Sequence, residues 1–460
     1  MSGIRKVAGL AMVAALGLIL GNGSSATARP AAPAGGRQDT GAKQQPYTMP
    51  EYNSEQACQS EKNPTTMAKC LDDFVAKYPN SNLLIYVYPL YIQAYGQLKD
   101  YPKVIAYAQK EESLGDKIDA TAKFNSYFTQ AVAYTTLLGD PRFKNKEAQD
   151  PTLAKAIVDA VGKGLTTLGT VKKPDNVAED AWGAQVKQFK ITLNTVGAQA
   201  STVLKDYPSV INFYKAVLAV NPDEPITNYS LGRTYLSLTP PQPMDAIWYV
   251  ARAVSSKSAT EAQVKQLTPY LRKLIENYQG GTVCDSITDS EQKELLQLAA
   301  SSVDRPSSYN LPSSADLDTA RKDMTIASVV ADLKAGGDKS KITWLASCGL
   351  EFPGVPGKVI EVVPGAADSD PIVFKIAFVT SDAEFDAATT PNMDLKVVGQ
   401  PEAKRVEKDG AVHFTGTLVS YDPDPAFMLH WEKGKIADED IPKEKEAPKK
   451  TVHKKRPSGD

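Results

Sequence analysis

The chain has 460 residues, enough for two or three domains that each bury a core of their own. Its 52 basic and 54 acidic residues leave a formal net charge of −2. A charge so close to zero creates no overall field that would attract nucleic acid or an anionic membrane surface. Charge therefore indicates neither of these classes of partner.

The first 28 residues predict export. Arg5 and Lys6 precede an apolar run from Val7 to Gly21, and Ala26-Thr27-Ala28 places small residues where a signal peptidase needs them. The apolar run has 15 residues, fewer than the ~20 that span a bilayer, so we expect no integral membrane anchor. We predict cleavage after Ala28 and a periplasmic or secreted protein.

Four cysteines agree with an oxidising compartment, where disulfides persist. Neighbourhood in the sequence favours Cys58 with Cys70 and Cys284 with Cys348, although four cysteines allow three connectivities. Cys58 and Cys70 are too far apart along one straight helix, at about 18 Å, but Pro64 between them lets two helical arms fold back. Zinc is the alternative, and the absence of a CxxC motif argues against it.

An eight-residue phrase occurs twice in the region from residue 51 to 280, where apolar residues recur at helical spacing. It reads LKDYPKVI from Leu98 and LKDYPSVI from Leu204, 106 residues later, which is about three units of roughly 35 residues. Each copy follows one apolar helical run and precedes another. We therefore expect the phrase to be the turn of a helical hairpin, with its aspartate and proline ending one helix and beginning the next.

The stretch from Tyr207 onward resembles the tetratricopeptide repeat (TPR), in which two helices alternate in about 34 residues. The residues that carry the resemblance are Val210, Tyr214, Val217 and Pro222 in a second helix, and Leu231, Gly232 and Tyr235 in the next first helix. We expect Gly232 to let the facing helix approach closely, with Tyr235 beside it and Ala246 and Ala253 opposite.

The resemblance implies stacked hairpins with a concave groove that binds a protein or peptide. Tyrosines crowd the first hairpin, and tyrosine is enriched at binding surfaces. At helical spacing they fit the core of the stack as well, and both interpretations stay open. The residues that we nominate for the groove are Tyr88, Tyr91, Tyr95, Tyr127, Asn228 and Arg233.

After Lys341 the apolar pattern changes from helical to alternating, which indicates β-strands. Five strand candidates are Gly357 to Val363, Pro371 to Thr380, Met393 to Val398, Ala411 to Tyr421 and Phe427 to Ile436. Five strands in about 80 residues fit a small barrel of the OB type, and Gly416 within the fourth predicts a bulge or a bend. The stretches GKVIEV and VHFTGTLVSYDPDP resemble OB-like domains of exported bacterial proteins. An OB helix between strands three and four has only Pro401 to Val406 available.

The predicted fold class is thus α+β and multidomain, with an all-α, TPR-like solenoid of helical hairpins followed by an OB-like five-stranded barrel. The predicted divisions are a signal peptide (1–28), a disordered leader (29–50), the helical repeats (51–280), a helical connector (281–340), the β domain (341–436) and a disordered tail rich in Lys, Glu and Pro (437–460).

Nothing in the sequence indicates catalysis. Pairing the last two strands across residues 421–426 places His430 opposite Thr417, about 13 Å from His413, too far to share a metal. Asp422 and Asp424, separated by prolines, are typical of a turn rather than a calcium site. P-loop, GxSxG, HExxH and dinucleotide motifs are absent. We expect no enzyme, no cofactor and no metal.

Two functions remain. One is a non-catalytic scaffold or adaptor of the bacterial cell envelope that binds a protein or peptide in the groove of the repeats. The alternative is a carrier or sensor that binds a small ligand or glycan through the β domain. Binding of nucleic acid is not expected, because the lysines of the tail are interspersed with glutamates and the chain is exported.

Overall fold

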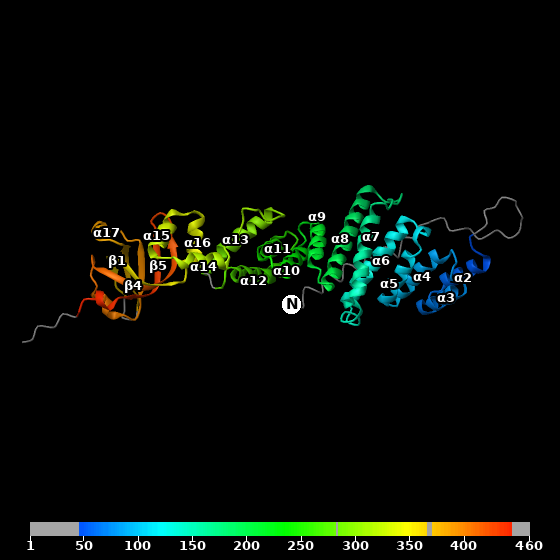
Figure 1. The fold of residues 1–460 in the computed structure, drawn as a ribbon, viewed down its shortest axis with the longest axis horizontal. Coiled ribbons are helices and arrows are strands. Elements are labelled where there is room, and N and C mark those ends of the chain that lie inside the picture. Colours follow the sequence, from blue (N-terminus) through cyan, green and yellow to red (C-terminus); the bar gives the residue numbers. More distant parts are fainter. Residues whose placement is uncertain (1–45, 282–283, 366–369, 444–460) are drawn as a thin grey trace, which may run out of the picture. The chain divides into compact units, whose positions relative to one another are not determined.

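A computed structural model describes residues 46–281, 284–365 and 370–443 (Figure 1). The predicted signal peptide, most of the leader and most of the tail lie outside these residues. The chain divides into two compact units, one comprising residues up to Leu267 together with Ala299–Val303, the other Thr268–Leu298 together with the residues from Asp304 onward. The predicted α+β, multidomain fold class is confirmed: helices precede a closed five-stranded barrel.

The first unit is built from helices that follow one another in chain order, each packed against the next (Figure 1). They are α2 (Met49–Ser60), α3 (Pro64–Lys77), α4 (Leu84–Gln97), α5 (Tyr101–Glu112), α6 (Ala120–Gly139), α7 (Pro151–Leu168), α8 (Glu179–Val203), α9 (Tyr207–Val220), α10 (Pro225–Leu236) and α11 (Pro243–Ser255). Several begin with an Asp or Asn cap and have proline at the first or second helical position. Proline is tolerated there because N–H groups in the first turn have no acceptor within the helix, so its lack of an N–H costs no hydrogen bond. Local sequence therefore sets where these helices begin.

Both copies of the repeated phrase form the turn between two helices, α4–α5 and α8–α9, as predicted. Lys99 and Lys205 occupy the left-handed region with φ of 56° and 58°. The N–H of the following residue, Asp100 or Asp206, donates to the carbonyl of Tyr95 or Ser201 at 2.9 and 3.0 Å. The same eight-residue phrase thus produces the same turn in two hairpins.

At Gly232 the backbones of α10 and α11 approach each other closely. A Cβ added there would lie 2.8 Å from the carbonyl oxygen of Ala246 and 3.2 Å from the backbone nitrogen of Val250. Beside this contact Tyr235 stacks on Tyr249, with ring centroids 5.6 Å apart. The predicted role of Gly232, to let the facing helix approach, is confirmed.

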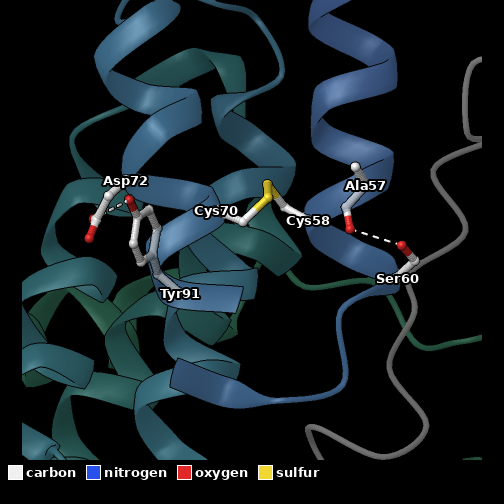
Figure 2. Close-up of a disulfide and its surroundings, with 6 residues drawn as sticks. All are labelled: Ala57, Cys58, Ser60, Cys70, Asp72 and Tyr91. Carbon is white, nitrogen blue, oxygen red and sulfur yellow. Dashed lines mark hydrogen bonds between the residues drawn. A yellow bond between two sulfur atoms is a disulfide. The ribbon is translucent and has the colours of Figure 1, made fainter. Parts of the chain in front are cut away.

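The disulfide between Cys58 and Cys70 joins α2 and α3 (Figure 2). The break around Pro64 brings the two Cα atoms to 5.4 Å, as predicted. Figure 2 also shows Asp72 of α3, which accepts a hydrogen bond of 2.7 Å from the hydroxyl of Tyr91 on α4. The disulfide and this hydrogen bond connect three successive helices.

Helices α12 (Glu261–Tyr278) and α13 (Asp285–Ser301) contain residues of both units. In the second unit they are followed by α14 (Ser314–Lys322), α15 (Ile326–Ala335) and α16 (Gly337–Ser347). The second disulfide, Cys284–Cys348, is also present as predicted. It ties the start of α13 to the residue after α16. No helix within the described residues has the length and apolarity needed to cross a bilayer.

The barrel consists of five strands that close in the order β1-β2-β3-β5-β4. Their bounds are β1 (Glu351–Val363), β2 (Ile372–Phe378), β3 (Met393–Val397), β4 (Ala411–Asp422) and β5 (Met428–Ile436), with a short helix α17 (Asp382–Ala387) between β2 and β3. All five predicted strands are present, although β1 begins six residues earlier than expected. Between β3 and β4 there is only a 3₁₀ helix, Pro401–Arg405, which places Ala403 in the barrel core.

Side chains fill the barrel interior. Trp431, Phe374 and Phe414 are buried there, and the Trp431 and Phe414 rings meet edge to face at 5.4 Å. Val329 and Leu333 of α15 belong to the same core. The interior is therefore a packed core, and any ligand of this domain would have to bind outside it.

The register of β4 and β5 differs from the prediction. His430 lies opposite Ser420, not Thr417. The ladder shifts at two places, between Thr415 and Thr417 and between Leu418 and Ser420, and the first is the predicted bulge at Gly416. The prediction failed because it placed the turn at residues 421–426, whereas Asp422 already pairs with Met428 and the turn spans residues 423–427. Both bulges lie farther from the turn than His430 and do not affect its partner.

Candidate functional site

Three of the nominated groove residues lie on α4 and take part in one aromatic stack. Tyr91 and Tyr95 have exposed fractions of 1% and 6%, and Tyr88 is half-buried. The ring of Tyr107 on α5 lies 3.9 Å from that of Tyr91 and 5.5 Å from that of Tyr95, centroid to centroid. This tyrosine cluster (Tyr88, Tyr91, Tyr95 and Tyr107) holds α4 against α5.

Lysines and a carboxylate surround the tyrosine cluster. The ammonium of Lys103 lies 4.5 Å from the Tyr95 ring centroid, and that of Lys110 lies 4.3 Å from the Tyr107 centroid. Burial and the hydrogen bond to Asp72 raise the pKa of Tyr91 far above the usual value for tyrosine. Tyr91 therefore stays neutral, donates to Asp72 and acts in packing, while only the half-buried Tyr88 and Tyr107 offer accessible surface.

Tyr127 lies in a different setting, at a hollow between α6 and α7. The hollow has a volume of about 590 Å³. Its lining combines hydroxyl, carboxylate, ammonium and apolar groups, from Tyr127, Val158, Asp159, Gly162, Lys163, Thr166 and Thr167. Gly162 leaves free space in this hollow, because a Cβ added there would meet no atom within 4 Å. We refer to this feature as the α6–α7 hollow.

A charge network that reaches across three helices borders the α6–α7 hollow. The Lys163 ammonium lies 2.8 Å from a carboxylate oxygen of Glu112 on α5 and 2.7 Å from one of Asp159 on its own helix. Gln130 of α6 donates to the other Glu112 oxygen at 3.1 Å. The hydrogen bonds to Asp159 and Glu112 raise the pKa of Lys163 above its usual range. Lys163 thus stays charged and fixed beside the hollow, with two carboxylates for one cation.

The last two nominated residues lie on α10 and differ in exposure. Asn228 is 0% exposed, and its amide donates to the carbonyls of Pro222 and Glu224 at 3.1 and 2.9 Å, which closes the turn before α10. Arg233 is exposed, with its guanidinium 5.9 Å from the Tyr229 ring centroid. Asn228 therefore stabilises the fold, while Arg233 remains accessible to a partner.

Of the residues at and beside the hollow, Tyr127 was predicted from the sequence, whereas Asp159, Lys163 and Glu112 were not. The spacing of four between Asp159 and Lys163 on a helix is a signal that could have been used. Glu112 lies 51 residues from Lys163 and carries no such signal. The network across α5, α6 and α7 appears only when the hairpins stack.

Each of the two barrel histidines contacts at least one carboxylate. His413 contacts Asp440 at 3.1 Å, and His430 lies between Asp394 and Asp422, at 2.9 Å from each. Within residues 46–281, 284–365 and 370–443, no three His, Cys, Asp or Glu side chains are arranged to hold a metal ion. His430 cannot gather both carboxylates around one ion, because they contact opposite nitrogens of its ring.

Comparison of the chain with models of protein families finds no match. A comparison with curated proteins also finds none. The function of the protein is therefore inferred from its sequence, its fold and the α6–α7 hollow.

Proposed function

We propose that this protein is a non-catalytic scaffold or adaptor of the bacterial cell envelope, whose TPR-like helical hairpins bind an extended segment of a protein partner. The observation that carries this proposal is the α6–α7 hollow. It combines an aromatic ring, an aliphatic side chain and fixed charges on a stack of hairpins. Stacked hairpins create extended surfaces of the kind that bind peptides.

The chemistry of the hollow suits a peptide. Backbone N–H groups of a peptide find an acceptor in Asp159, and its carbonyls find donors in Lys163 and the threonine hydroxyls. Val158 and the ring of Tyr127 supply apolar contact for one side chain. Because two carboxylates face one ammonium, a partner segment with a basic side chain is favoured over an acidic one.

The compartment is inferred from the disulfides. Both pairs of cysteines are bonded, and such bonds form and persist outside the reducing cytosol. This agrees with the export signal expected in the first 28 residues, which lie outside the described part of the chain. The proposed location is the periplasm or the exterior of a bacterial cell.

A glycine pair provides the test. Gly162→Gln places a side chain in the hollow, while Gly183→Gln places the same side chain on α8, where an added Cβ also meets nothing within 4 Å. Both changes favour helix formation, so both variants should fold. We expect partners captured from periplasmic extract by the immobilised mature chain to be lost with Gly162→Gln and kept with Gly183→Gln.

A photo-crosslinker resolves the contact further. Placed at the exposed Thr166 beside the hollow, it should form an adduct with the captured partner, while the same group at exposed Gly183 of α8 should not. Equal capture by both glycine variants, or crosslinking from both positions alike, would contradict binding at the hollow. Binding of a small ligand or glycan by the β domain, the alternative function, would instead show as a thermal shift of the chain that is unchanged by Gly162→Gln.

A further inference from the structure

A row of charged side chains crosses the outside of the barrel at the level of His430. Asp394 on β3 is the direct neighbour of His430 in the parallel β3–β5 ladder. Its two carboxylate oxygens lie 2.9 Å from Nδ1 of His430. On the other side Asp422, the last residue of β4, lies 2.9 Å from Nε2. One imidazole thus bridges three strands.

Both ring nitrogens face carboxylates, which have no proton to donate when ionised. Only the protonated imidazolium, with two N–H groups, can satisfy both Asp394 and Asp422. A neutral ring carries one N–H, so its second nitrogen would direct a lone pair at a carboxylate oxygen 2.9 Å away. Deprotonation therefore must break one of the two contacts.

The two carboxylates are held unequally. Asp394 is anchored by Lys375 of β2 at 3.1 Å, and its side chain is 13% exposed. Asp422 has a side chain 64% exposed and borders the turn to β5. On β5 itself, the charge of Glu432 is matched by Lys396 of β3 at 3.3 Å. The contact that breaks on deprotonation is consequently the one to Asp422.

The turn after Asp422 and the adjoining end of β4 contact the helices α15 and α16. Phe427 at its end packs against Tyr421, and the ammonium of Lys334 on α15 lies 5.2 Å from the Phe427 ring centroid. Tyr421 in turn packs edge to face on Trp344 of α16 at 4.9 Å. Loss of the contact between Asp422 and His430 would therefore free the chain next to Tyr421 and Phe427 and weaken their packing on α15 and α16.

We propose that His430 is a pH-sensitive latch: as the protonated imidazolium it ties Asp422 to Asp394 and holds the β4–β5 turn (residues 423–427) against α15 and α16, and on deprotonation it releases the turn. Burial alone lowers the pKa of His430, but the hydrogen bonds and charges of Asp422 and Asp394 outweigh it and raise the pKa above the usual value for histidine. The latch is closed below the raised pKa and opens as the pH rises through it. This inference does not depend on the proposed partner binding.

Hydrogen exchange of the full mature chain tests the latch. Exchange of the peptide that spans residues 424–430 is measured by mass spectrometry at pH 5.5 and 8.5, with correction for the intrinsic rate. In this peptide the N–H of Leu429, next to His430, donates to the carbonyl of Asn392 at 2.9 Å. We expect protection at pH 5.5 and a loss of protection at pH 8.5 of about tenfold or more. In His430→Gln, which cannot change charge, the corrected exchange should be the same at both pH values.

Two further variants keep the proposal falsifiable. His413→Gln removes the other barrel histidine, which contacts Asp440, and should leave the pH dependence unchanged. Asp422→Ala removes the carboxylate that His430 releases on deprotonation, so exchange should be fast at both pH values. This test can be made even if His430→Gln does not fold. A wild-type turn whose protection does not change with pH, or a change that persists in either His430→Gln or Asp422→Ala, overturns the latch.

Discussion

Asp100 and Asp206 perform the same task in two hairpins of the first unit. Each side chain accepts a hydrogen bond of 3.3 Å from the backbone N–H three residues later, that of Lys103 or of Ser209. Each follows a lysine with nearly the same positive φ and precedes a Tyr-Pro pair that begins the next helix. The repeated phrase therefore encodes a complete helix–turn–helix junction in local sequence.

Removing these caps should weaken both hairpins by similar amounts. Asp100→Ala and Asp206→Ala should each lower the free energy of unfolding by about 1 kcal/mol, because an N–H at the start of the helix loses its partner. The caps belong to different hairpins, so the double variant should lose the sum to within about 0.5 kcal/mol. Urea unfolding measures all three. Asparagine at either position keeps the acceptor, and an equal loss with asparagine would show that capping is not the cause.

Gly232 should tolerate no side chain. In Gly232→Ala the new methyl group would approach the backbone of α11, which cannot move aside cheaply, so we expect a loss of about 1–3 kcal/mol. The matched substitution Gly162→Ala meets no atom within 4 Å and should instead gain about 0.5–1 kcal/mol from helix propensity. Denaturant unfolding of both variants is the measurement. Changes of the same sign in the two would contradict the close approach of α10 and α11.

Glu111 should make the stability depend on pH. Its side chain is 6% exposed at the end of α5, and burial raises its pKa from 4.5 to about 7. As the pH rises from 4.5 to 7 the unfolded chain releases this proton while the folded chain retains it, so folding stability falls across that window and then levels off. The loss is on the order of 3 kcal/mol.

Glu111→Gln removes this titration. The variant should lack this component of the pH dependence and should be more stable than the wild type at pH 8, as measured by unfolding in urea at pH 5 and pH 8. Glu147→Gln, at an exposed position, is the control and should behave like the wild type. A wild-type pH dependence that survives in Glu111→Gln would assign the effect to other groups.

Each disulfide should stabilise the chain, and the one that closes the longer loop should contribute somewhat more. Cys58–Cys70 has a sequence separation of 12 and Cys284–Cys348 one of 64, which corresponds to about 3 and about 4 kcal/mol from restriction of the unfolded chain. Replacing each pair by serine, one pair at a time, should lower the melting temperature. Addition of dithiothreitol should then cause no further loss in a chain that lacks both pairs, and a further loss would point to an effect of the reductant itself.

Local sequence was sufficient for the elements of the barrel, but not for the way its strands align. Alternating apolar residues placed all five strands, and Gly416 marked the bulge in β4. The register of β4 and β5 was wrong by three residues at His430, because the turn lies at residues 423–427 and not at the predicted 421–426. A register depends on the whole ladder, and a single misplaced residue shifts every pair beyond it.

The sequence by itself determined the features that short stretches of chain can specify: the duplicated hairpin turn, the approach at Gly232, the pairing of neighbouring cysteines and the strand pattern. Only the tertiary structure decided which distant side chains meet. Glu112 reaches Lys163 across 51 residues, and Asp394 reaches His430 across 36. Helical and strand periodicity act over a few residues, whereas these contacts arise when separate hairpins stack and the barrel closes. Both the charged border of the α6–α7 hollow and the latch at His430 depend on such contacts.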